Sequence, residues 1–182
     1  MSAPQHSLLK LRHALLADDS PVPYRDRALR SGMLPLGTPG RVALEDQEAQ
    51  VQAFRVQVAH LLADPRAPVD VHLPGEPTLS GRLHDLYAGG RVVLQPGRVK
   101  PKGLFQLWIE HLALHASGWS GTSTLLGPSG GSRLRPMAAD KAAAQLDRLR
   151  NGYRKGLAQP LLFWPDVSLD ACRADDRAEA RR

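Results

Sequence analysis

The spacing of apolar residues and the positions of helix breakers predict helices in five stretches of the chain. These stretches are residues 7–17, 24–31, 46–62, 104–116 and 138–155. In the third of them, Val51, Phe54 and Val58 form an apolar stripe at helical spacing, and Asp64-Pro65 ends it. Residues 34–40 form a turn-rich connector before that helix.

Shorter apolar runs that are bounded by turn residues predict strands. These runs are residues 41–44, 69–73, 78–86, 91–95 and 122–126, with a returning strand at 132–136. Ala88-Gly89-Gly90 joins two of the strands and is typical of a hairpin. With the returning strand left aside, the order from residue 46 onward is helix, three strands, helix, strand and helix.

This order predicts an α/β fold in which a mixed central sheet is flanked by helices. We expect residues 1–45 to form N-terminal helices and a connector, and residues 46–165 to form the core. Residues 166–182 are polar and alternate in charge, so we expect a disordered tail.

Composition narrows the class of protein. The 182 residues suit one domain with a proper core, and the net charge of +6 permits an anionic partner such as DNA. A single cysteine, Cys172, excludes an internal disulfide and a cysteine-based zinc site. The sequence has neither an apolar run of membrane-spanning length nor a signal peptide, so we expect a cytoplasmic protein without membrane contact.

The segment from Leu79 to His115 resembles the active-site half of a nuclease of the PD-(D/E)xK class. That class carries Gly-x-x-Asp, a strand ending in Asp-x-Lys, and a helix with Gln-x-x-Tyr. At the corresponding positions this chain has His84 for the first acid, Pro96 for the second and Arg98 for the lysine, whereas Gln106 is retained. The resemblance implies a nuclease-like fold whose catalytic residues have been lost.

The ligand preferences of divalent cations support the loss of the catalytic residues. Phosphodiester hydrolysis of this kind needs divalent cations that prefer carboxylate oxygens, and proline offers no ligand. Asp85 follows His84 directly, and on a regular strand neighbouring side chains point to opposite faces. We therefore expect no catalytic residue, no metal and no cofactor.

Three sequence blocks carry a second resemblance. They are Ala28-Leu29-Arg30-Ser31-Gly32-Met33-Leu34-Pro35-Leu36-Gly37, Gln106-Leu107-Trp108-Ile109-Glu110-His111-Leu112 and Gly152-Tyr153-Arg154-Lys155-Gly156-Leu157. In this order they resemble the C-terminal region of the gamma subunit of exodeoxyribonuclease V, the RecC family. The likeness runs from about Leu8 to about Trp164.

The resemblance implies a non-catalytic domain of a RecBCD-like complex that repairs double-strand breaks by homologous recombination. Its partners would be RecB-like and RecD-like subunits, and double-stranded DNA ends would reach it through the complex. Family members are several times longer, so we expect the chain to be a fragment of such a subunit. Two alternatives are an active metal-dependent nuclease, whose site has migrated to Asp85, Glu110 or Asp70, and a relic without function.

Two further patterns invite a chemical interpretation. His111 and His115 are spaced like zinc ligands on one helix face, with His84 as the only candidate third ligand. The simpler interpretation is that these histidines lie on the helix surface or bond to backbone carbonyls. Residues 127–131 match the Gly-x-Ser-x-Gly of a hydrolase, but a returning strand follows them, so we expect a hairpin.

Basic and apolar residues supply candidate contacts. The candidate DNA contacts are Arg98, Lys100, Lys102, Arg133 and Arg135. The alternative is that they are solvated surface charges. Phe163 and Trp164 could dock onto this domain or contact a partner subunit.

Overall fold

The computed structural model describes residues 29–168, apart from Ser31, Met33, Phe163, Pro165 and Asp166. The predicted helix at 7–17 and most of the helix at 24–31 lie outside these residues. The same holds for the predicted disordered tail, except for Val167 and Ser168.

The chain divides into two compact units. The first contains residues 1–63, 94–98 and 127–130, and the second contains residues 64–93, 99–126 and 131–182. The three-part division that we inferred from the sequence stays a prediction, and its first boundary falls within a helix of the first unit.

That helix is α3, Thr38–Val58, followed by the short 3₁₀ helix η1, Ala59–Leu61. The strand predicted at residues 41–44 was wrong, because these residues belong to α3. Leu44 precedes Val51 by seven residues, which is two helical turns, so both side chains lie on the buried face. Pro39 in the first turn favours a helix start at this point.

The strands of the described residues form two sheets. Strands β1, Val69–Leu73, and β2, Leu79–Leu83, are antiparallel and make a two-stranded sheet. The other sheet has the order β3-β4-β5-β6, with β3 at Leu86–Tyr87, β4 at Gly90–Leu94, β5 at Ser123–Gly127 and β6 at Gly130–Leu134.

The four-stranded sheet is mixed, as predicted. Strands β3 and β4 are antiparallel across the expected glycine hairpin. The amide of Arg91 donates to the carbonyl of Thr122 at 2.8 Å, so β4 and β5 begin at the same edge and run parallel. Helix α4, Pro101–Ala116, connects them, and β6 returns beside β5 as the sequence indicated.

The strand predicted at residues 78–86 is interrupted. In the structure it is two strands, β2 and β3. The break occurs because Asp85 has a φ of 63°, which ends the extended backbone after His84. The alternation argument that turned Asp85 to the opposite face of a regular strand therefore does not apply. Both side chains are exposed instead.

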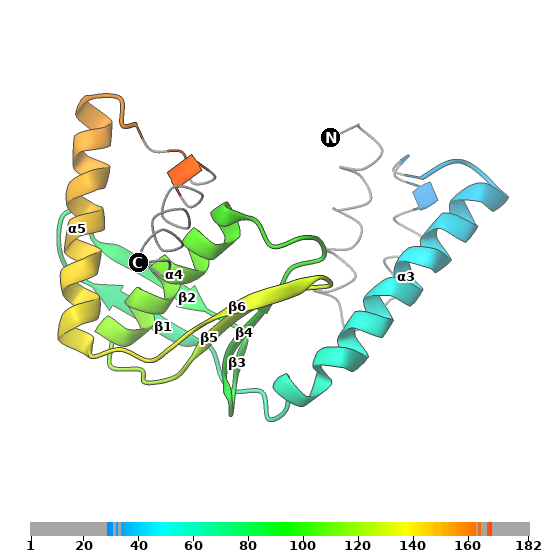
Figure 1. Ribbon diagram of the computed structural model, residues 1–182, viewed down its shortest axis with the longest axis horizontal. Helices are drawn as coiled ribbons and strands as arrows, with labels where there is room; N and C mark the ends of the chain where they lie inside the picture. Colours follow the sequence, from blue (N-terminus) through cyan, green and yellow to red (C-terminus); the bar gives the residue numbers. More distant parts are fainter. Residues whose placement is uncertain (1–28, 31, 33, 163, 165–166, 169–182) are drawn as a thin grey trace, which may run out of the picture. The chain divides into compact units, whose positions relative to one another are not determined.

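Helix α4 is central to the second unit. It packs against helix α5, Ala139–Ala158, and against β1 (Figure 1). Leu112 of α4 meets Ala142 and Leu146 of α5 in one buried cluster, while Leu114 joins Val71 and Leu86 in another. The mixed sheet and flanking helices are thus confirmed, and the nuclease-like interpretation of this fold stays a prediction.

Candidate functional site

A buried cation, Arg91, is connected to two of the positions that the nuclease resemblance involves, the His84 backbone and, through Glu110, Gln106. Arg91 in β4 has a side chain that is only 6% exposed, and its Nη1 is 2.6 Å from Oε2 of Glu110 in α4. Its Nε donates to the carbonyl oxygen of His84 at 3.0 Å. One guanidinium therefore ties the end of the β2 segment to helix α4.

The retained glutamine belongs to the same cluster. Gln106 lies one helical turn before Glu110, and its Nε2 donates to Glu110 Oε1 at 2.9 Å. Both carboxylate oxygens of Glu110 thus have partners, one in Arg91 and one in Gln106. We call Arg91, Glu110, Gln106 and the His84 carbonyl the guanidinium cluster.

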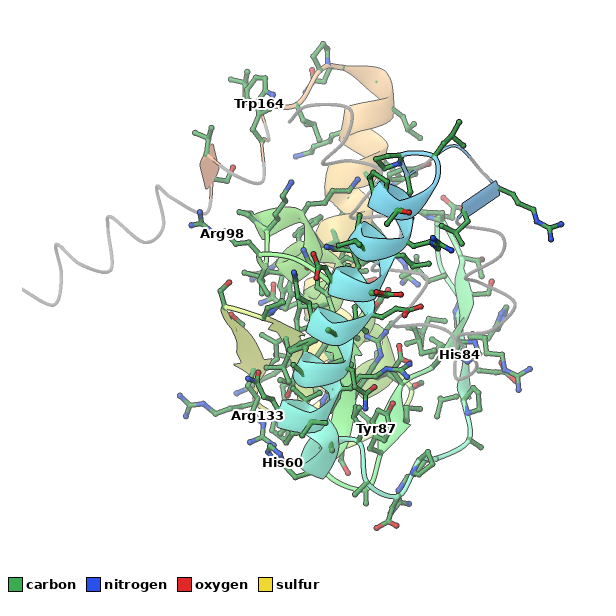
Figure 2. All side chains as sticks on the ribbon, turned by 90° about the vertical axis from the view of Figure 1, so that its right-hand side faces the viewer. His60, His84, Tyr87, Arg98, Arg133 and Trp164 are labelled. Atoms are coloured by element: carbon green, nitrogen blue, oxygen red, sulfur yellow. The ribbon has the colours of Figure 1, made fainter. Side chains whose placement is uncertain are left out.

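The cluster determines what the site can do chemically. A carboxylate that is bonded to a guanidinium has its negative charge offset, and a second cation beside that guanidinium would be repelled. The His84 side chain is exposed, so it is the backbone of this residue that takes part (Figure 2). The arrangement is suited to holding β2, β4 and α4 together.

Sequence reasoning did not find Arg91. A signal was available, because Arg91 is a charged residue at the start of the apolar strand that was predicted at residues 91–95. A charge in such a strand is costly to bury unless a carboxylate pairs with it. Glu110, within the apolar half of α4, is the matching residue.

The remaining degenerate positions lie in the first unit. Pro96 is buried and Arg98 is exposed, and the backbone carbonyl of Arg98 accepts a hydrogen bond from Gln95 Nε2 at 2.9 Å. The turn at residues 95–98 is therefore closed by a side chain.

The other acids that a migrated nuclease site would need are scattered. Oδ1 of Asp70 lies 3.7 Å from Nε of Arg82 on the surface of the β1–β2 sheet. The side chain of Asp85 is exposed. Within the part of the chain that the structure describes, no three acidic, histidine or cysteine residues gather so as to hold a metal ion.

The two histidines of α4 are buried, and each bonds to a backbone carbonyl. His111 Nε2 donates to the carbonyl of Arg135 at 3.1 Å, and His115 Nε2 donates to that of Gly121 at 3.0 Å. With Nε2 protonated, His111 Nδ1 accepts from the Ser123 hydroxyl at 2.8 Å. Of the two simpler interpretations, the bonds to backbone carbonyls are confirmed, and the position on the helix surface was wrong.

Burial favours the neutral form of His111. Desolvation lowers the pKa of His111 below its ordinary value of 6.5, and the adjacent His115 ring lowers it further. The bond to the Arg135 carbonyl opposes this, and the charge of Arg91 adds to the lowering. The two imidazole rings are 4.3 Å apart between centroids, so positive charge on His115 would disfavour a proton on His111.

Residues 127–131 form the predicted hairpin between β5 and β6. A nucleophile elbow requires a helix directly after the serine, and here β6 follows. The hydrolase interpretation is therefore wrong.

The candidate DNA-contact residues are exposed and belong to different segments of the chain. Lys100 and Lys102 lie at the N-terminus of α4, and Arg133 and Arg135 lie in and after β6. Arg133 and His84 lie well apart in the second unit (Figure 2). Trp164 is 59% exposed, and Phe163 lies outside the described residues.

None of the helices in the described residues combines the length and apolarity that crossing a membrane requires.

Comparisons with known proteins agree with the three sequence blocks. The family model described as RecC C-terminal domain matches residues 6–176. The chain is 32% identical to the RecBCD enzyme subunit RecC of Escherichia coli (strain K12) over 159 residues. That alignment covers 86% of this chain and 14% of the relative, so the chain spans about one-seventh of the relative's length. The chain belongs to the RecC C-terminal domain family.

Proposed function

We propose that this chain is a non-catalytic domain of a RecBCD-like exodeoxyribonuclease V complex. In this proposal it acts in the repair of double-strand breaks by homologous recombination, through subunit assembly and DNA guidance. The observation that carries the assembly role is the family match over residues 6–176. The matched relative is a subunit of the RecBCD enzyme.

The guanidinium cluster supports the non-catalytic part of the proposal. If the chain descends from a nuclease, Arg91 now supplies positive charge beside the retained Gln106, and it does so from within the protein. Such a cation stabilises the fold without activating water. The alternative of an active nuclease has less support, because Glu110, one of its three candidate acids, is already bonded on both oxygens.

DNA guidance is proposed for the exposed cations. Lys100 is the N-cap residue of α4 and Lys102 lies in its first turn, where the backbone amides also carry partial positive charge and no residue is acidic. Such an end favours phosphate oxygens. Arg98, Arg133 and Arg135 are proposed as additional phosphate contacts, which would position DNA without reading its sequence.

Gel filtration tests the assembly role. The full chain would be mixed with RecB-like and RecD-like subunits from the same genome, and we expect it to elute with them. The Trp164→Ala variant should bind less well, because an exposed tryptophan is a typical interface anchor. Leu36→Ala is the matched control, since Leu36 is 86% exposed on the first unit. A chain that elutes alone in every mixture would refute the assembly role.

A nuclease assay tests the catalytic alternative. Linear double-stranded DNA would be incubated with the purified chain and millimolar Mg²⁺ or Mn²⁺. We expect no cleavage above that of a buffer control. Cleavage that disappears in Asp85→Ala or Glu110→Gln would establish the migrated site instead.

A further inference from the structure

An apolar groove runs along helices α4 and α5 in the second unit. Its volume is about 810 Å³. Its walls include Trp108 and Ile109 of α4, Leu149 and Tyr153 of α5, and Leu161 and Leu162 after α5. All of these are large apolar or aromatic side chains from one compact unit.

The groove continues a stripe of apolar residues on α5. Leu146 is 2% exposed in the core, whereas Tyr153 is 56% exposed and Leu157 is 71% exposed. The stripe thus begins in the contact with α4 and emerges from it toward the C-terminal end of the helix. Leu161 and Leu162, at 43% and 89% exposed, extend the apolar surface beyond the helix.

Positive charge borders this surface. Among the residues that line the groove, the charged ones are Arg148 and Arg150. Arg150 is engaged within the domain, because it bonds to Asp147 and to the carbonyl of Leu73. Arg148 is exposed. From residue 148 to residue 155, α5 carries four basic residues and no acidic one. One of the four, Arg154, has its Nη1 3.8 Å from Oε2 of Glu76.

We infer that this groove binds an amphipathic helix of a partner protein, with acidic residues flanking its apolar stripe. Two facing helices with apolar walls suit the helix-in-groove mode of recognition, in which anchors at positions i, i+3, i+4 and i+7 enter the groove. Sites for polar metabolites carry several convergent polar groups, and the walls of this groove are almost wholly apolar. The basic rim selects acidic flanks.

The inference deepens the proposed assembly function by naming the chemistry of the contact. The experiment below distinguishes a failure of the groove inference from a failure of the assembly proposal. A fluorescein-labelled helical peptide of about 18 residues, long enough to form a helix, would carry a leucine stripe and glutamate flanks. A second peptide would have lysine at every glutamate position. Fluorescence anisotropy would measure the binding of each to the full chain.

We expect the acidic peptide to bind at least about tenfold more tightly than the basic one. The double variant Tyr153→Ala/Leu162→Ala should weaken that binding by roughly tenfold or more. Both side chains are mainly exposed, so the fold should persist, and circular dichroism would verify this. Arg148→Glu should narrow or reverse the preference between the peptides.

Matched controls lie outside the groove. Val56→Ala removes an exposed apolar side chain from the first unit, and Lys141→Glu reverses a charge at the other end of α5. Neither should change peptide binding. Absence of binding, equal affinity for both peptides, or insensitivity to the groove variants would overturn the inference.

A second copy of this chain is the competing occupant of the groove. Sedimentation velocity that shows a dimer, abolished by Tyr153→Ala/Leu162→Ala, would assign the groove to a second copy and overturn the inference. If the chain does not co-elute with the RecB-like and RecD-like subunits but binds the acidic peptide, the groove inference holds while the assembly proposal fails. If the unsubstituted chain co-elutes with the subunits but does not bind the acidic peptide, the assembly proposal holds while the groove inference fails.

Discussion

Arg91 and Glu110 are 19 residues apart in the chain, yet Nη1 of one lies 2.6 Å from Oε2 of the other. The arginine is 6% exposed and the glutamate 23%, so the pair is largely removed from water. Because Arg91 also bonds to the His84 carbonyl, the pair connects three segments of the second unit. Burying these charges is costly, and the cost is offset only while every partner is present.

Removing Glu110 is therefore expected to destabilise the domain. Glu110→Ala leaves Arg91 buried without its carboxylate, and we expect the free energy of unfolding to fall by about 3 kcal/mol. Urea denaturation followed by circular dichroism measures this. Asp70→Ala breaks the exposed pair with Arg82 and should cost at most about 1 kcal/mol. Equal losses in the two variants would contradict the structural role of the cluster.

Stability should depend on the protonation of His111. Its pKa in the folded state lies below 6.5, so the folded chain binds fewer protons than the unfolded chain in that range. The stabilisation is complete above pH 6.5 and is lost as pH falls from 6.5 through the folded-state pKa. Urea midpoints measured from pH 8 down to pH 5.5 should show this decline.

His111→Gln is the matched variant for that experiment, because glutamine can still bond to the Arg135 carbonyl but does not titrate. We expect this variant to be less stable than the unsubstituted chain at pH 8. Its urea midpoint should also change less with pH. A slope as steep as that of the unsubstituted chain would assign the effect to other groups.

Two neighbouring glycines in the β3–β4 hairpin should respond differently to alanine. Gly90 has a φ of 126°, and a Cβ there would lie 2.6 Å from the Thr122 carbonyl oxygen. We expect Gly90→Ala to cost at least about 1–3 kcal/mol from backbone strain, with the clash in addition. A Cβ on Gly89 would meet no atom within 4 Å, so Gly89→Ala should be nearly neutral. Thermal melts of both variants would decide this, and equal melting temperatures would contradict the close approach of β4 to Thr122.

If Lys102 contacts a phosphate, its loss should appear in the salt dependence of DNA binding. In the assembled complex, Lys102→Ala is expected to reduce the slope of log K against log salt by about 0.9 for duplex DNA. Affinity should fall equally for all sequences. Lys141→Ala is the control, because Lys141 holds a similar position in the first turn of α5. Identical slopes for the two variants would remove Lys102 from the DNA-contact set.

Much of the local structure could be predicted from the sequence. Strand 69–73 was predicted with the bounds of β1, and α4 ends at Ala116 as expected. These elements were predictable because apolar spacing and turn residues act within a few positions of the chain. The error at residues 41–44 was also local, since Leu44 continues the stripe that was recognised only from Val51.

The interruption at His84–Asp85 could not be read from the sequence. Leu79 and Leu83 have the spacing of one strand, and only the positive φ of Asp85 shows where that strand is divided from Leu86. The candidate acids were misjudged for a related reason. Glu110 looked available as a metal ligand, because nothing in its neighbourhood in the chain shows that Arg91 lies beside it.

The sequence by itself determined the family, the order of most helices and strands, and the hairpins, because each depends on short-range spacing or on blocks of residue identity. The tertiary structure alone decided which charged residues pair, which histidines are buried and which apolar residues of α5 are left uncovered. Pairing and burial depend on segments that meet only after folding. Residues as far apart as Arg91 and Glu110 therefore act together only in the folded chain.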